Sequence, residues 1–450
     1  MGKKMLRILA AALCLAAFSI PANADLLFTR QDNGYSNTAL GIFHGTSAPV
    51  SPLISNMGGN AGQGLYSFKN ADGAFRVAVS LYTGNGTDVI SIYDPGEQQN
   101  WTQTSAWSAP IREATTTLHN TRALVELDGN LYATAYDIPI VSRITTAGDV
   151  YKQDMKYEYY HNDSKYDGHG EALVAYNGNL YGIFTGSDDP WNLTSGSYRL
   201  NELVKLDKDL NEVATVTMEG KNLDGFTPGA YCLKGSKLYV ATMGGVQPFG
   251  DKWNTESRIE IVDLDTMEVE TLVTAEDVNG IDSTFTHMFN SVIFAGDKIY
   301  IQAAKWTSQD EYAAGYSIRL YETTEDKLKE GDIGELVREF TGDYGYRVGL
   351  VYDEATKYLW VAAGYSIWRY DGSNWTEFDS DALKGNISAF AAVDNGGSMP
   401  GDSEETQPPA TDDGNGGGGG GGGGGCNSGW GGSAILALAF VPVIIRHIKR

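Results

Sequence analysis

The chain has 450 residues, 57 of them acidic and 33 basic, so its formal net charge is -24 at pH 7. Six basic residues and no acidic ones lie at the two extreme ends, which leaves 27 basic against 57 acidic residues, or -30, between them. A region this acidic repels phosphate groups, which argues against a nucleic-acid partner or an anionic lipid surface. The 42% of hydrophobic residues exclude a chain that is disordered throughout.

Residues 1–24 have the pattern of a secretory signal peptide. A basic start is followed by the apolar run Leu6 to Ile20 and by the small-residue cleavage site Ala22-Asn23-Ala24. The apolar run is shorter than the about 20 residues that cross a bilayer, although an uncleaved anchor is the alternative. We therefore expect signal peptidase to cut after Ala24 and the mature, exported chain to begin at Asp25.

The middle of the chain repeats a short hairpin. Four segments of identical length each contain an apolar stretch, a tight turn and a second stretch that ends in Tyr; they are Leu124–Tyr132, Leu173–Tyr181, Tyr231–Tyr239 and Val292–Tyr300. Looser copies lie at residues 65–79 and 349–361, and the spacing is about 50 to 60 residues.

A second hairpin follows each copy and has its own recurring turn. Its members include Asp94, Asp207, Asp265 and Asp371, each just after an apolar stretch. Four strands per repeat at this period are typical of a β-propeller blade, in which each sheet packs against two neighbours. A β-sandwich is the alternative, but it does not explain the period.

The two ends of the repeat region are incomplete in complementary ways. A seventh inner strand, Ile387 to Val393, has no further strands after it, whereas the runs Leu26–Gln31, Thr38–Phe43 and Val50–Ile54 lack an inner strand. Joining them closes the ring and removes exposed sheet edges. We predict an all-β, seven-bladed propeller domain over residues 25–395, closed by both ends of the chain. It resembles bacterial secreted seven-bladed propellers, a resemblance that implies architecture but no activity.

Three consecutive repeats carry long loops between their second and third strands. Each loop contains one tryptophan, and these are Trp191, Trp253 and Trp306. Exposed indole rings suit sugars, peptides or a protein partner, so we take the three as the candidate ligand-binding residues. The alternative is that each ring folds back over a neighbouring blade.

Three of the six histidines precede inner strands. His119 and His287 each lie 13 residues before the repeat Tyr, and His169 lies 12 before its own. With Arg122 and Glu171, which occupy matching positions, they form a candidate catalytic group at the channel mouth, able to hold a transition metal or act as acid and base. The one-residue offset works against convergence, because adjacent strand positions face opposite sides.

Two acidic clusters raise the question of calcium. The segment 277–282 places oxygen ligands around a glycine, and Asp207 begins an alternating pattern, but neither matches the full calcium-binding loop. Since Asp207 aligns with the recurring turn residues, we expect it to cap a hairpin. No cofactor is predicted, and calcium or a transition metal is the alternative.

The C-terminal part has the order of a tether. Residues 396–425 are acidic and then glycine-rich, which favours a flexible linker, and residues 426–450 contain Cys426, a short apolar run and a basic end. This order resembles the C-terminal sorting signals of Gram-negative exported proteins, and the string around Cys426 is similar to the Synergistes type. The resemblance implies cleavage by a sorting protease and attachment to the cell surface; a plain membrane-spanning tail anchor is the alternative.

These observations favour a binding module over an enzyme. We expect a monomeric, exported propeller, tethered at the cell surface, that binds a carbohydrate, peptide or protein ligand in the cell envelope or outside the cell. The alternative is a propeller enzyme, a lyase or hydrolase, with the histidine-containing site at the channel mouth. A surface scaffold with no small-molecule site is a third interpretation.

Overall fold

The computed structural model describes the chain between residues 25 and 392. Gaps in this description lie at residues 32–37, 46, 58–59, 83–86, 97–100, 108, 148–149, 161–167, 188–197, 245–255, 280–286, 307–315, 343–347, 355 and 384. The predicted signal peptide with Ala24, the linker and the C-terminal segment with Cys426 lie outside the described residues. Among the helices that are described, none is long and apolar enough to cross a membrane.

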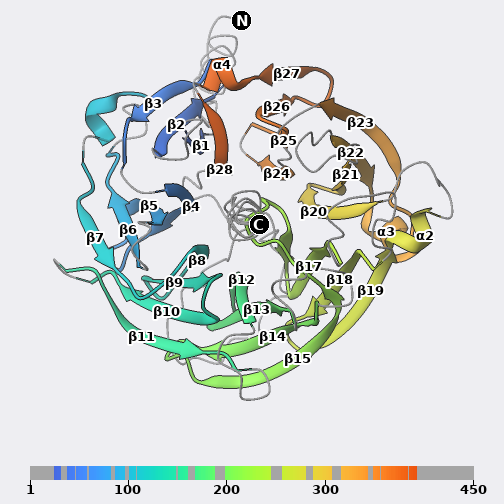
Figure 1. The fold of residues 1–450 in the computed structure, drawn as a ribbon, viewed down its shortest axis with the longest axis horizontal. Helices are drawn as coiled ribbons and strands as arrows, with labels where there is room; N and C mark the ends of the chain where they lie inside the picture. Colours follow the sequence, from blue (N-terminus) through green and yellow to red (C-terminus); the bar gives the residue numbers. More distant parts are fainter. Residues whose placement is uncertain are drawn as a thin grey trace, which may run out of the picture.

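Seven four-stranded antiparallel sheets form a ring (Figure 1). The first blade is β28 (Asn386–Ala392), β1 (Asp25–Gln31), β2 (Thr38–His44) and β3 (Val50–Ile54). The second is β4 (Asn60–Lys69), β5 (Phe75–Tyr82), β6 (Asp88–Tyr93) and β7 (Arg112–Thr115). The third is β8 (Thr121–Leu127), β9 (Asn130–Ala135), β10 (Ile140–Thr145) and β11 (Lys152–Glu158).

The remaining blades repeat the same order. The fourth is β12 (Gly168–Tyr176), β13 (Asn179–Gly186), β14 (Leu200–Asp207) and β15 (Glu212–Lys221). The fifth is β16 (Tyr231–Lys234), β17 (Lys237–Thr242), β18 (Arg258–Asp263) and β19 (Glu268–Thr274). The sixth is β20 (Met288–Ala295), β21 (Lys298–Trp306), β22 (Tyr316–Thr323) and β23 (Glu335–Gly342), and the seventh is β24 (Val348–Asp353), β25 (Tyr358–Ala363), β26 (Ser366–Tyr370) and β27 (Trp375–Phe378).

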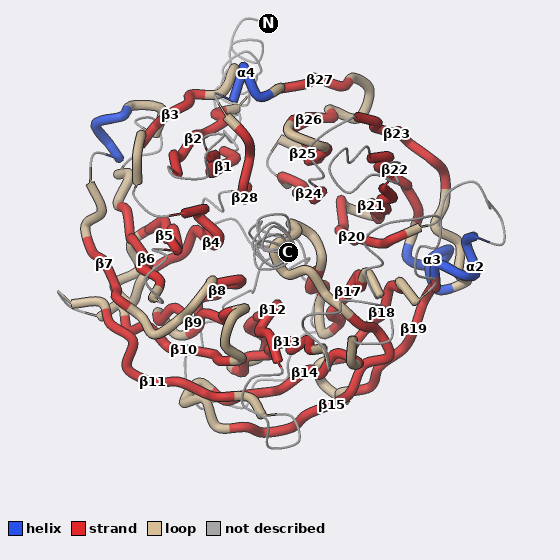
Figure 2. The backbone as a smooth tube through the Cα atoms, viewed as in Figure 1, coloured by secondary structure: helices blue, strands red, loops and turns tan. Residues whose placement is uncertain are grey.

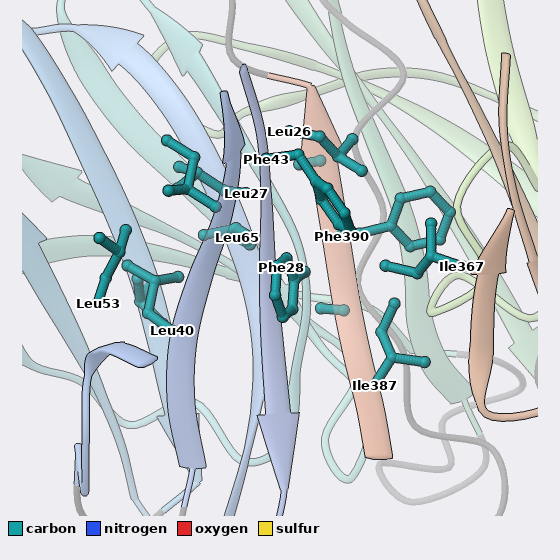
Figure 3. Packing of buried hydrophobic residues seen from close by; sticks show 14 of the residues in the cluster. Leu26, Leu27, Phe28, Leu40, Phe43, Leu53, Leu65, Ile367, Ile387 and Phe390 are labelled. Atoms are coloured by element: carbon teal, nitrogen blue, oxygen red, sulfur yellow. The ribbon is translucent and has the colours of Figure 1, made fainter. Parts of the chain in front are cut away.

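The predicted seven-bladed propeller is confirmed, including its closure. β28 pairs with β1, and Phe390 lies opposite Phe28 in the register. Their side chains join one buried cluster that also takes Leu65 from the second blade and Ile367 from the seventh (Figure 3). The closing blade is therefore packed against both of its neighbours, and burial of this apolar surface stabilises the ring.

Short helical turns occur in the connections, although the sequence pattern had indicated no helix between strands. They are η2 (Thr104–Trp107), α2 (Ala275–Asn279), α3 (Glu325–Lys329) and α4 (Ser380–Leu383), and they lie toward the outside of the ring (Figure 2). The Thr324 side chain caps α3 by accepting a hydrogen bond from the Lys327 N–H.

Two of the repeat tyrosines connect neighbouring blades. The Tyr132 hydroxyl in β9 donates to the carbonyl of Lys208, 2.7 Å away in the β14–β15 turn of the next blade. The Tyr181 hydroxyl in β13 likewise donates to the carbonyl of Leu264 at 3.0 Å, next to the β18–β19 turn. Tyr132 and Tyr181 thus help to fix how one blade sits on the following one, whereas the hydroxyl of Tyr300 bonds to Glu322 within its own blade at 2.8 Å.

The recurring turn aspartates act mostly as the sequence indicates. Asp207 accepts hydrogen bonds from the backbone N–H groups of Asp209 and Asn211, both at 2.9 Å, as a hairpin cap does. In the β18–β19 turn this task belongs to Asp263, which accepts from the Asp265 N–H at 2.9 Å. The cap of this turn was expected at Asp265, but it is Asp263, two residues earlier, because the last residue of the strand provides the capping side chain.

Candidate functional site

A segment of nine residues, 222–230, crosses the middle of the ring before β16 begins; we call it the central segment. The carbonyl of Pro228 accepts hydrogen bonds from the Leu350 N–H at 2.8 Å and the Ser291 hydroxyl at 2.9 Å. The carbonyl of Gly229 accepts from the Val292 N–H at 2.7 Å. A loop is visible beside the central axis in Figure 2. Inner strands of the sixth and seventh blades are thereby tied to a segment of the fifth, and the channel is not a simple open tube.

Arg122 and Glu171, which the sequence places at matching positions, meet beneath this segment. Arg122 lies in β8 and Glu171 in β12, and Arg122 Nε is 3.4 Å from Glu171 Oε2 with side chains only 2% and 3% exposed. Glu171 Oε2 also accepts the N–H of Gly225 at 3.0 Å. The carboxylate therefore joins three blades: its own, that of Arg122 and that of the central segment.

Aromatic rings cover the guanidinium group. Arg122 Cζ lies 4.0 Å from the centre of the Tyr136 ring, and Phe226 of the central segment packs on it as well. Such contacts stabilise a cation that has little access to water.

Burial shifts the pKa of both charged groups. It lowers the pKa of Arg122, an effect that the nearby Glu171 and Asp224 oppose. It raises the pKa of Glu171 to about 7; Arg122 counteracts this shift and Asp224 adds to it. The carboxyl group of Glu171 can thus gain or lose a proton near neutral pH.

His169 stands at the edge of the same group and is half-buried. Its ring stacks on Tyr136 with 4.0 Å between centroids, and its Nδ1 is 2.6 Å from the Tyr136 carbonyl oxygen. Since a carbonyl only accepts, Nδ1 carries the hydrogen, which leaves Nε2 as an acceptor. Burial lowers the pKa of His169, so the ring is neutral at pH 7.

Two tyrosines that sequence reasoning missed complete the group. Burial raises the pKa of Tyr136 to about 12, opposed by Arg122 and reinforced by Glu171 and Asp224. The pKa of Tyr198 is also raised, by burial and then by its proximity to Tyr136, Glu171 and Asp224. Tyr136 directly follows the second strand of its blade, and in the sequence this position at a strand end was the signal that could have pointed to a role in the site.

His287 is turned away from this group. His287 is 1% exposed, and its Nε2 is 2.7 Å from the hydroxyl of Tyr321 in β22, so its ring turns into its own blade. His119 is partly exposed, and its carbonyl accepts the Asp137 N–H. No group of three or more His, Cys, Asp or Glu side chains able to hold a metal ion occurs in the part of the chain that the structure describes. Of the five candidate catalytic residues, the structure brings together Arg122, His169 and Glu171.

The structure describes only the stems of the loops that carry the three candidate tryptophans. Trp191 and Trp253 lie outside the described residues, and Trp306 ends β21 opposite Tyr316. The stem of the loop with Trp191 is a bridge between Ser187 and Tyr198. The stem of the loop with Trp253 begins at Met243 and Gly244, whose N–H groups bond to the carbonyls of residues 222 and 221, where the central segment starts.

The candidate calcium ligands are bonded within the protein where they are described. Asp207 caps its turn, and the Asp277 carboxylate accepts from the Thr274 hydroxyl at 2.7 Å and from the Thr274 N–H at 3.3 Å. Residue 282 lies outside the described residues.

No protein-family model matches the chain, and no curated protein matches it either. Among solved structures, it is similar to a putative 6-phosphogluconolactonase from Bacteroides fragilis, with 14% identity, a TM-score of 0.49 and coverage of 84% of this chain and 99% of that one. A second similar structure is a putative 6-phosphogluconolactonase from Bacteroides uniformis, with 12% identity, a TM-score of 0.49 and coverage of 82% and 99%. A third is the periplasmic gluconolactonase of Pseudomonas aeruginosa, with 12% identity, a TM-score of 0.44 and coverage of 83% and 99%. Likeness at this level assigns no activity to the chain.

Proposed function

We propose that the protein is an exported, cell-surface-tethered binding module for a carbohydrate, peptide or protein ligand. The observation that carries the proposal is the position of the loop stems. Tyr198 belongs both to the stem of the Trp191 loop and to the group around Tyr136, and the Trp253 loop starts where the central segment starts. One candidate loop therefore begins at the cluster of half-buried rings, and a second begins at the start of the central segment whose Phe226 packs on Arg122, an arrangement suited to ligand recognition.

The test is a binding screen on glycan and peptide arrays with the full-length protein. The variant Trp191→Ala/Trp253→Ala/Trp306→Ala is expected to lose the ligand. The matched control, Trp191→Phe/Trp253→Phe/Trp306→Phe, keeps a flat ring at each position and is expected to retain part of the signal. Equal binding by the wild type and the alanine variant rejects this face as the binding surface.

A second candidate function, a hydrolase or lyase, is favoured by one observation. The Glu171 carboxyl group has a pKa of about 7 and lies beside Arg122, and a carboxyl that titrates near neutrality is suited to general acid–base catalysis. Release of nitrophenol from nitrophenyl glycosides and esters, abolished by Glu171→Gln, supports this candidate. Equal rates for the wild type and Glu171→Gln reject it.

A further inference from the structure

The group around Tyr136 contains a buried donor that lacks an acceptor. No described residue accepts a hydrogen bond from Arg122 Nη1, although the side chain is 2% exposed. Leaving such a donor unpaired costs about 1–3 kcal/mol. The guanidinium is thus held by the rings of Tyr136 and Phe226, and its fixed position orients Tyr136.

Three of the neighbouring polar side chains are uncharged and have defined hydrogen-bonding roles. His169 Nε2 is an acceptor, because Nδ1 donates to the Tyr136 carbonyl. Tyr136 and Tyr198 keep their hydroxyl protons because burial raises the pKa of each. One acceptor and two hydroxyl groups, which both donate and accept, match the hydroxyl groups of a ligand.

Charge selects against an anionic ligand at this place. Asp224, Asp137 and Glu171 contribute negative charge around Arg122, and the nearby cations are Arg122 itself and Arg199 beside His169, so acidic side chains outnumber basic ones here. The body of the chain adds a net charge of -30 from 27 basic and 57 acidic residues. A carboxylate or phosphate on the ligand would meet repulsion that a neutral hydroxyl does not.

We infer that Tyr136, His169 and Tyr198, with Arg122 behind them, form a subsite for a neutral saccharide that is recognised through its hydroxyl groups. The inference rests on the proposed binding function and names the ligand class. Tyr136 serves through its hydroxyl edge, because one ring face is covered by His169 and the other by Arg122. Arg122 lies behind the Tyr136 ring and holds it in place, since its own Nη1 is buried.

Saturation-transfer NMR with the full-length protein tests the subsite. The probes are D-glucose, D-galactose and D-mannose, with D-glucuronate and D-galacturonate as charged counterparts. At least one neutral sugar is expected to give signals, and its uronate to bind at least tenfold more weakly. Equal or stronger signals from the uronates overturn the ligand class, and absence of signals from all neutral sugars overturns the subsite.

Two variants remove single hydrogen-bonding groups. Tyr198→Phe deletes one hydroxyl, and His169→Asn keeps a donor for the Tyr136 carbonyl while removing the Nε2 acceptor. Each is expected to weaken sugar binding about tenfold, equivalent to about 1.4 kcal/mol. Tyr176→Phe is the control. Tyr176 lies at the opposite end of β12 from His169, and its hydroxyl bonds to Asp265. Thermal unfolding confirms that each variant is folded, and if His169→Asn is not, Tyr198→Phe decides.

The subsite and the proposed function fail in different ways. A ligand that depends on the three tryptophans but not on His169 or Tyr198 leaves the binding module intact and rejects the subsite. A sugar that depends on Tyr198 but not on the tryptophans supports the subsite and rejects the tryptophan face.

Discussion

At the scale of single residues, the ion pair of Arg122 and Glu171 is the most exacting feature of the molecule. Both side chains are almost fully buried, and Glu171 also holds the Gly225 N–H. Removing one charge leaves the other without compensation in a place that water does not reach. The pair therefore constrains the site more than it stabilises the fold.

Arg122→Met is expected to lower the free energy of unfolding by about 3–5 kcal/mol, because it leaves the Glu171 carboxyl without its cation. Denaturant unfolding measures this loss. The double variant Arg122→Met/Glu171→Gln removes the second charge and keeps an acceptor for Gly225, so it is expected to lose less. A single variant that unfolds like the wild type contradicts the pairing.

Glu260 gives a prediction about pH. It is fully buried in β18, accepts the Glu219 and Gly220 N–H groups, and has its pKa raised to about 7, mainly by burial. The folded state thus holds this proton to higher pH than the unfolded state, whose value is 4.5. Its stabilising contribution is complete below pH 4.5 and is lost as pH rises to about 7, by up to about 3 kcal/mol.

Glu260→Gln is therefore expected to become more stable relative to the wild type as pH rises from 4.5 to 8. Unfolding curves along this range measure the difference. Glu325→Gln is the control of opposite sign. The pKa of Glu325 is lowered to about 2, because hydrogen bonds from Lys329, Tyr239 and Lys234 outweigh the effect of burial. The stabilising contribution of Glu325 is therefore lost as pH falls from 4.5 to about 2. A difference for Glu260→Gln that does not change with pH contradicts the burial argument.

At the scale of elements, the central segment depends on close backbone packing. A Cβ atom at Gly225 would overlap the backbone oxygen of Glu171. Gly225→Ala is expected to cost at least about 3 kcal/mol in unfolding free energy and to displace the segment. The control is Gly182→Ala in β13, where an added methyl group would lie 3.3 to 3.7 Å from side-chain atoms of Phe184 and Val141 and only a small shift of Phe184 is needed. Similar stability of the two variants contradicts the packing.

The tyrosine contacts between blades give a further prediction. Tyr132→Phe and Tyr181→Phe each remove a hydroxyl that bonds to the next blade, with an expected loss of about 1 kcal/mol apiece. Tyr370→Phe is the control, since its hydroxyl bonds to Gly372 within its own turn. Thermal unfolding checks the order, and an equal effect at Tyr370 contradicts a role in blade packing.

The same elements show what sequence could predict. Hairpins and their recurring Tyr and Asp are local patterns, so the seven blades and the closing strands followed from them. The central segment has no periodic pattern, and its partners Ser291 and Leu350 lie far along the chain. The matching positions of Arg122 and Glu171 belong to the local repeat pattern and were evident from the sequence. Their burial beneath Phe226 was not evident, because Phe226 belongs to the central segment. The outward or inward turn of each histidine ring depends on neighbours such as Tyr321, which spacing does not reveal.

At the scale of the whole molecule, the ring closes through strands from the two ends of the folded region. β28 is the innermost strand of a sheet whose other three strands come first in the sequence. A ring closed in this way leaves no blade incomplete, and it places every interblade loop on one of two ends. The Trp191 stem and the Tyr136 group lie at the same end, which is why we assign recognition there.

Binding of a ligand at this end of the ring is measured most directly by the array screen of the full-length protein. We expect a ligand that the wild type binds, that Trp191→Ala/Trp253→Ala/Trp306→Ala loses and that the matching phenylalanine variant partly retains. The same ligands bound with the same strength by all three proteins would contradict it.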